Sequence, residues 1–97
     1  MTTKTSTVPS IDFSTRFNRD LAAAPREIKA AFRDALQLFR DDPHHSALRN
    51  HALTGSFSGY YSIDVTEDWR ALFTETVSDK DVRVIFRLLG NHKQLYG

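Results

Sequence analysis

Apolar residues in the first half of the chain recur at the spacing of α-helices. From Pro25 to Arg40 they repeat every three or four positions and so share one face of a predicted helix: Ile28, Ala31, Phe32, Ala35, Leu36 and Phe39. A shorter helix is predicted before it, with Ser14 as its N-cap. Residues 11–13, Ile-Asp-Phe, precede that helix and are predicted to form a short edge strand.

From Ala47 onward the pattern changes to that of β-strands. Three runs are rich in β-branched and aromatic residues, namely 60–65, 69–75 and 82–89. Short polar turns separate them, so neighbouring strands are predicted to be antiparallel, with the helices covering one face of the sheet. We therefore predict an α+β fold with two N-terminal helices packed on a small antiparallel β-sheet.

Composition limits the chain to one domain. It has 97 residues, of which 40% are hydrophobic, enough for one modest core. We assign residues 11–97 to a single domain and the polar residues 1–10 to a flexible N-terminal arm. Cysteine is absent, which suits a reducing compartment, and no apolar run has the length of a signal peptide or membrane span. A soluble, cytoplasmic protein is the expectation.

The net charge of +1, from 13 basic and 12 acidic residues, gives little overall attraction to nucleic acid. Arginines do recur every seven residues along the second predicted helix, at 26, 33 and 40. Acidic residues follow each of them by one position, however, at 27, 34 and 41. This interleaving favours a solvated face of mixed charge over an RNA-binding stripe, so any basic surface must come from local arrangement.

Four ionisable groups stand at predicted strand ends: His51, Asp68, Arg70 and His92. Antiparallel pairing of the second and third long strands would bring Asp68 and His92 to the same end of the sheet, whereas His51 depends on the fold to join them. Each residue also has an ordinary interpretation. The histidines are compatible with simple surface positions, Asp68 with a turn cap, and Arg70 with a cross-strand ion pair.

A metal site is not predicted. The chain has four histidines and no cysteine, and the adjacent His44 and His45 do not have a recognised ligand spacing. A glycine-rich phosphate loop and a nucleophile elbow are also missing from the sequence.

Four segments in the second half together resemble the RelE/ParE toxin superfamily. They are 50–55 (NHALTG), 59–63 (GYYSI), 68–70 (DWR) and the C-terminal 90–96 (GNHKQLY). Within that superfamily the sequence is most similar to the YafQ-type, RelE-like messenger-RNA interferases of type II toxin–antitoxin systems. The resemblance extends over residues 11–97 and includes the order of two helices followed by a sheet, so it implies the RelE-like microbial ribonuclease-type fold.

The resemblance implies a metal-independent endoribonuclease that cuts messenger RNA in the ribosomal A site and is silenced by a small antitoxin. His51, Asp68 and His92 fall where this branch keeps catalytic residues, and Tyr96 falls where it keeps an aromatic. Asp64 stands where the branch often has a further histidine, and is an auxiliary candidate.

These residue types suit RNA cleavage by the 2′-hydroxyl, which needs a base, an acid and positive charge at the phosphate. We predict His51 and His92 to transfer protons and Asp68 to orient or charge an imidazole. Arg70 would hold the phosphate, and Tyr96 would stack or make a proton contact. Which histidine is the acid and which the base stays open at this point.

Two other functions remain as alternatives. One is a ParE-like toxin that binds a protein target such as gyrase without cutting RNA; His51, Asp68 and His92 argue against it. The other is a toxin fold with weakened catalysis that is kept as an interaction partner, for which Asp64 and the balanced charge leave room.

Overall fold

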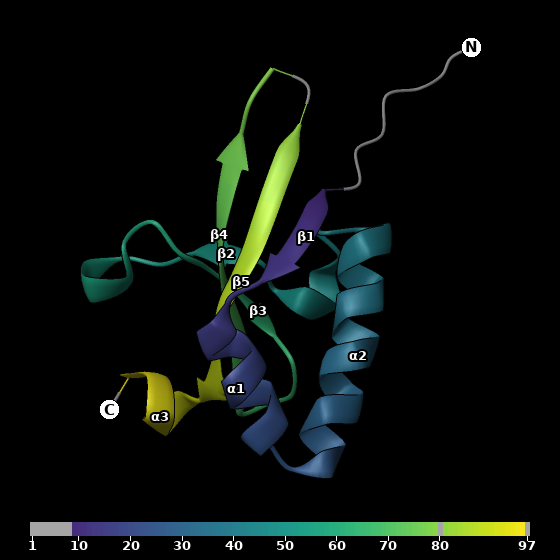
Figure 1. Ribbon diagram of the computed structural model, residues 1–97, viewed down its shortest axis with the longest axis vertical. Helices are drawn as coiled ribbons and strands as arrows, with labels where there is room; N and C mark the ends of the chain where they lie inside the picture. The colour runs from purple at the N-terminus through teal and green to yellow at the C-terminus, as the bar shows by residue number, and fades with distance from the viewer. Residues whose placement is uncertain (1–8, 80, 97) are drawn as a thin grey trace.

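The computed structural model describes residues 9–79 and 81–96, and within them three α-helices pack on one five-stranded sheet (Figure 1). The predicted N-terminal arm falls mostly on residues 1–8, outside the described residues. In chain order the elements are β1 (Ser10–Phe13), α1 (Thr15–Ala23), α2 (Arg26–Asp41), the 3-10 turn η1 (Ser46–Leu48), β2 (His51–Ala52), the 3-10 turn η2 (Gly55–Phe57), β3 (Tyr61–Asp64), β4 (Trp69–Val77), β5 (Val82–Asn91) and α3 (His92–Tyr96).

The predicted α+β fold is confirmed. The Ser14 hydroxyl caps α1 by accepting a hydrogen bond from the amide of Phe17 at 3.0 Å. α2 spans Arg26–Asp41, one residue later at each end than the predicted helix. All three predicted long strands are present as β3, β4 and β5. Two elements were not predicted, the two-residue strand β2 and the C-terminal helix α3.

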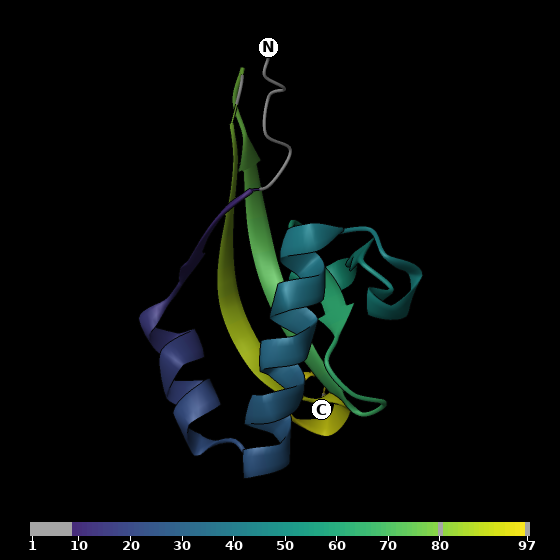
Figure 2. The ribbon, with the colours of Figure 1, turned by 90° about the vertical axis from the view of Figure 1, so that its right-hand side faces the viewer.

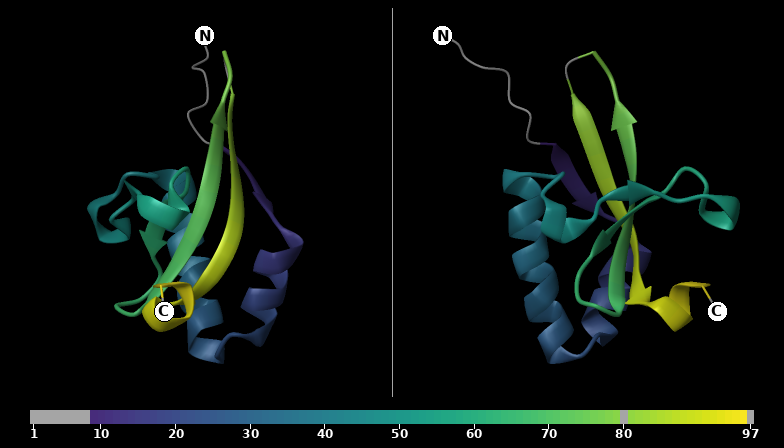
Figure 3. Two further views of the ribbon diagram at one scale, coloured as in Figure 1. Left: turned by 90° about the vertical axis from the view of Figure 1, so that its left-hand side faces the viewer. Right: turned by 180° about the vertical axis from the view of Figure 1, so that it is seen from behind.

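The strand order is β1-β5-β4-β3-β2, and every neighbouring pair is antiparallel except β1 with β5. The first strand in the chain thus lies beside the last one, because α1 and α2 carry the chain away from the sheet before β2 begins. α1 and α2 stand together against one face of the sheet (Figure 2), while α3 and η2 project from the other side (Figure 3). The sheet therefore separates a helix-covered face from a more open one.

Aromatic rings fill the space between the two helices and the sheet. Phe86 of β5 lies at the centre, fully buried, and its ring centroid is 5.4–5.8 Å from those of five other phenylalanines: Phe13, Phe17, Phe32, Phe39 and Phe73. Rings at this separation add to the hydrophobic stabilisation from burial. This cluster fixes β5 against both helices.

A β-bulge in β5 changes which side chains face this core. Pairing with β4 shifts from Leu72 opposite Leu88 to Phe73 opposite Phe86, so Arg87 is the extra residue. Before the bulge Phe86 faces the core, and after it Leu89 does. Their spacing of three replaces the spacing of two of a regular strand. The bulge therefore sets the direction of the last residues of β5, from which α3 begins.

No helix in residues 9–79 and 81–96 is long and apolar enough to cross a membrane.

Candidate functional site

A pocket lies at the end of β2, β3 and β4, where they meet α3. Its lining contains Arg49, His51, Leu53, Ser62, Arg70, His92 and Tyr96, and no residue of α1 or α2. The alternation of side chains along β3 explains why the pocket lies on this face of the sheet. Ile63 belongs to the helix-covered core, so its neighbour Ser62 points to the opposite face. The pocket thus opens on the face that the long helices leave uncovered.

His51 enters the pocket from β2. It lies directly opposite Ser62 in the antiparallel pairing of β2 with β3. Its ring Nδ1 is 2.7 Å from the backbone carbonyl oxygen of Arg49. A carbonyl can only accept a hydrogen bond, so Nδ1 carries a proton and Nε2 of the neutral ring keeps its lone pair. The unpredicted strand β2 therefore supplies an imidazole in a defined tautomer, suited to accept a proton.

Arg49 precedes β2 and has an unusual backbone. Its φ of +48° is in the left-handed region, and among residues 9–79 and 81–96 no other non-glycine residue has a positive φ. A side chain in this conformation costs about 1–2 kcal/mol. Its Nε lies 2.8 Å from Oδ2 of Asp64, yet its side chain remains 66% exposed. The tertiary structure therefore holds a solvent-facing guanidinium at the pocket by one of its nitrogens.

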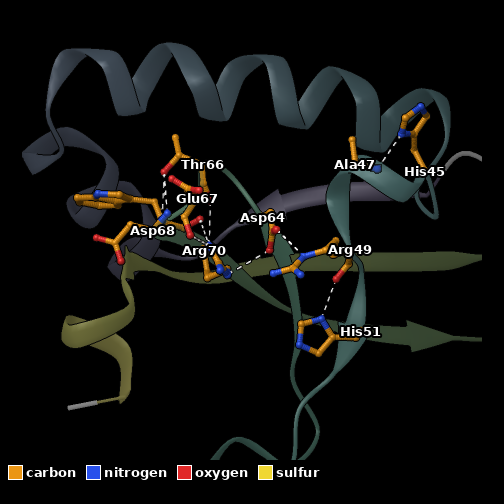
Figure 4. Close-up of polar contacts among 10 residues, drawn as sticks. His45, Ala47, Arg49, His51, Asp64, Thr66, Glu67, Asp68 and Arg70 are labelled. Atoms are coloured by element: carbon orange, nitrogen blue, oxygen red, sulfur yellow. Dashed lines mark hydrogen bonds and ion pairs between the residues drawn. The ribbon is translucent and has the colours of Figure 1, made fainter.

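Asp64, at the end of β3, lies between two arginines (Figure 4). Oδ2 accepts the bond from Arg49, and Nε of Arg70 lies 3.1 Å from Oδ1 as an ion pair without the alignment of a hydrogen bond. Asp64 and Arg70 are cross-strand partners in β3 and β4, and both side chains are largely buried. Asp64 therefore acts as an anchor for two guanidinium groups.

Nη1 and Nε of Arg70 are already engaged. Its Nη1 donates to the carbonyl oxygens of Thr66, Glu67 and Trp69 at 2.9–3.1 Å, and so closes the turn between β3 and β4. The side chain is 15% exposed. Arg70 lines the pocket, but much of its hydrogen-bonding capacity stabilises the turn behind it.

His92 begins α3, which is held by a reciprocal cap. Oδ1 of Asn91 accepts from the amide of Gln94 at 2.8 Å, while Oε1 of Gln94 accepts from the amide of Asn91 at 2.9 Å. This is the capping-box arrangement, here with Asn and Gln. The amide of His92 donates to the carbonyl oxygen of Asp68 at 3.0 Å. The cap and this bond together fix the point at which the chain turns into α3.

The predicted proximity of Asp68 and His92 is thus present in the structure, through their backbones. The carboxylate of Asp68 is exposed, does not line the pocket and makes no hydrogen bond to an imidazole within the described part of the chain. In Figure 4 it points away from Arg70.

Tyr96 closes the pocket from α3. Its ring centroid is 4.8 Å from that of His92 on the same helix and 5.6 Å from that of Phe57 in η2. Phe57 in turn packs against Tyr60, which immediately precedes β3. These contacts join the loop that follows β2 to the C-terminal helix, so the segments 50–55 and 90–96 meet around the pocket.

The pocket brings together four of the six residues that the sequence singled out: His51, Arg70, His92 and Tyr96. Asp64 lies behind them in the ion pairs, and Asp68 lies beside them. Sequence reasoning missed Arg49 and Ser62. The polar residue Ser62 within an apolar strand pattern was a signal, but the position of Arg49 depends on tertiary contacts.

The charge of the pocket differs from that of the whole chain. Two arginines and two histidines line it, and none of its described lining residues is acidic. Such a site favours an anion, and its histidines can transfer protons beside it. Within residues 9–79 and 81–96, no group of three His, Cys, Asp or Glu side chains is arranged to hold a metal ion.

A second groove lies between α1 and α2 and has a different character. Its floor is apolar, with Phe13, Leu21, Phe32 and Leu36 among its lining residues, and it contains no histidine. Lys29 and Arg33 are the ionisable groups among its described lining residues, which include no histidine or carboxylate.

Comparison with solved structures identifies the fold. The chain superimposes on YafQ from Escherichia coli with a TM-score of 0.73 at 22% sequence identity, covering 92% of this chain and 99% of that one. The toxin in the E. coli DinJ–YafQ toxin–antitoxin complex gives 0.70 at 22% identity, covering 92% and 98%. A YoeB/ParE toxin from Agrobacterium tumefaciens gives 0.67 at 15% identity, covering 86% and 98%. No family model and no curated protein matches the sequence. The chain therefore has the fold of RelE-like toxins.

The capping box predicts a local response to mutation. Asn91→Ala removes the acceptor for the amide of Gln94 and should weaken α3 by about 1 kcal/mol. We expect amide hydrogen exchange over residues 94–96 to accelerate about fivefold, while the core keeps its protection. Lys93→Ala on the same helix is the matched control, because Lys93 takes no part in the cap. Unchanged exchange in Asn91→Ala would show that the capping box does not hold α3.

Proposed function

We propose that this chain is the toxin of a type II toxin–antitoxin system and a metal-independent endoribonuclease that cuts messenger RNA on the ribosome, in the cytoplasm. The observation that carries the proposal is the pocket, in which two histidines and two arginines face one space on a RelE-like toxin fold. Such a set supplies proton transfer and phosphate neutralisation for cleavage by the 2′-hydroxyl.

His51 is assigned as the base. Its Nδ1–H is held by the carbonyl oxygen of Arg49, which leaves Nε2 to take the proton of the 2′-hydroxyl. The 2′-oxygen attacks phosphorus, the bond from phosphorus to the 5′-oxygen breaks, and a 2′,3′-cyclic phosphate forms. His92, also in the pocket, is assigned as the acid that protonates the departing 5′-oxygen.

Three further residues complete the proposed site. Tyr96, against the ring of His92, presents an aromatic surface on which a base can stack. The guanidinium of Arg70 adds positive charge near the phosphate, with Nη1 and Nε already bound within the protein. The backbone carbonyl oxygen of Asp68 accepts a hydrogen bond from the amide of His92, so Asp68 helps to position that histidine.

The first test removes each histidine. We expect His51→Ala and His92→Ala to lower cleavage by about 10²–10⁴-fold without unfolding the chain. The measurement is mapping of messenger-RNA 5′ ends after induction in cells that lack a candidate antitoxin. His44→Ala is the control, because His44 is exposed and outside the pocket.

Three results would count against the proposal. If messenger-RNA cuts persisted in both histidine variants, the pocket would not be the catalytic site. Growth arrest without cuts would favour a ParE-like protein target, and no arrest at all would favour a weakened toxin fold.

The assignment of acid and base has its own test. In an RNA whose 5′ leaving oxygen is replaced by sulfur, departure no longer needs a proton. We expect this substrate, presented on ribosomes, to restore cleavage by His92→Ala while His51→Ala stays inactive. Restoration in His51→Ala instead would reverse the two roles.

A cognate antitoxin is the proposed partner. The similar E. coli toxin is solved in complex with DinJ, its antitoxin. We expect a small protein encoded next to this chain to co-purify with it and to abolish its messenger-RNA cuts. The His92→Ala chain should bind that protein equally, because the loss concerns chemistry and not folding. A neighbouring protein that neither binds nor relieves arrest would contradict this partnership.

A further inference from the structure

We infer that Arg49 and Ser62 form the phosphate-binding subsite of the pocket, and that Asp64 and Arg70 hold Arg49 in place for it. This inference rests on the proposed function for the identity of its ligand, an RNA phosphate. The observations behind it do not depend on that function, because they are the hydrogen-bond donors that remain available at the pocket.

Arg49 has more available donors than Arg70. The side chain of Arg70 is 15% exposed, and its Nη1 makes three bonds to carbonyl oxygens. The side chain of Arg49 is 66% exposed and, within the described residues, makes one hydrogen bond, from Nε to Asp64. The outer edge of the Arg49 fork therefore remains available to bind phosphate, which a planar guanidinium does with two parallel bonds.

The ion pairs determine the position of this fork. A long exposed arginine is normally mobile, but here Nε is tied at 2.8 Å to a carboxylate that Arg70 holds from the other side. The order of support runs from the turn, through Arg70, to Asp64 and then to Arg49 (Figure 4). Asp64 and Arg70 are therefore positioning residues, and Arg49 is the group that touches the ligand.

Two further features of the pocket favour anion binding. Arg49 has the left-handed backbone described above, a strained state that persists where the surrounding structure requires it and that occurs often at ligand sites. Ser62, opposite His51 in the strand pairing, is 1% exposed, and its hydroxyl has no hydrogen-bond partner among the described residues. Buried hydroxyl groups are rarely left unpaired. Because Ser62 lines the pocket, its hydroxyl would donate a hydrogen bond to a phosphate oxygen bound there.

The test is a titration of the whole chain with inorganic phosphate at constant ionic strength, followed by NMR signals of Arg49, His51 and Ser62. We expect saturable shifts in the wild type. Arg49→Gly and Ser62→Ala should each weaken phosphate binding about tenfold. Glycine is chosen because it accepts a φ of +48° without strain, so this variant should fold. Arg16→Ala, which breaks a similarly exposed arginine–aspartate pair on α1, should change nothing.

Stability supplies a readout that separates binding from folding. The hydroxyl of Ser62 is buried and has no partner in residues 9–79 and 81–96, so Ser62→Ala should leave the melting temperature unchanged or raise it while phosphate binding falls. If phosphate bound Arg49→Gly and Ser62→Ala as tightly as the wild type, or caused no saturable shift in the wild type, the inference would be overturned.

Asp64→Ala tests the positioning role by the sign of its effect. If Asp64 holds Arg49, removing it frees the fork and weakens phosphate binding. If Asp64 only neutralises charge, removing it makes the pocket more positive and strengthens that binding. Weaker binding, recovered in part by Asp64→Glu, supports the inference; stronger binding overturns the role of Asp64.

The same variants distinguish this inference from the proposed function. A wild-type chain that binds phosphate at Arg49 but cuts no messenger RNA keeps the subsite and overturns the ribonuclease. A chain that cuts messenger RNA while its phosphate shifts are indifferent to Arg49→Gly and Ser62→Ala keeps the ribonuclease and overturns the subsite.

Discussion

The pairing of β4 with β5 is the constraint on which the rest of the structure depends. Phe86, in the middle of β5, packs among the phenylalanines that join the sheet to α1 and α2. This packing holds β5, and β4 paired with it, in place against the two helices. At its far end the same pairing sets Trp69 opposite Asn91 and so brings Asp68 next to His92. The bulge at Arg87 lies between these two regions. Because side chains alternate along a strand, the extra residue reverses the faces of every residue after it.

Much of the fold was predictable because its signals are local. The helical spacing of apolar residues gave α2, and β-branched and aromatic runs gave β3, β4 and β5. The parallel pairing of β1 could not be predicted in this way, since the choice of neighbour is made between residues far apart in sequence. α3 was missed although Asn91 and Gln94 have the spacing of a capping box, a local signal. The bulge, by contrast, was not visible in the sequence, because Ile85 and Leu88 are apolar as well and hide the change of core spacing from two to three after Val84.

The site, like the fold, combines features that local sequence predicts with features that only long-range contacts determine. Strand pairing predicted that Asp68 and His92 lie at the same end of the sheet, whereas the position of His51 depended on the fold; the pocket contains both histidines. The tautomer of His51 could not be predicted, because it follows from a carbonyl whose direction is set by the left-handed turn at Arg49. Arg49 was not singled out for the same reason: its left-handed backbone and its contact with Asp64, fifteen positions along the chain, arise only in the folded structure.

Asp64 shows why one changed residue does not by itself indicate a lost activity. At the position where the family resemblance led us to expect a histidine, this chain has a carboxylate, which taken alone removes an imidazole and adds a negative charge. In the structure that charge lies between two guanidinium groups and largely out of solvent, so it is offset by the arginines that it holds. The pocket keeps the imidazoles of His51 and His92, and the exposed guanidinium of Arg49 adds positive charge at its edge. A histidine placed at 64 without changing Arg49 would remove this anchor, so the aspartate and the two arginines are best understood as one unit whose members depend on each other.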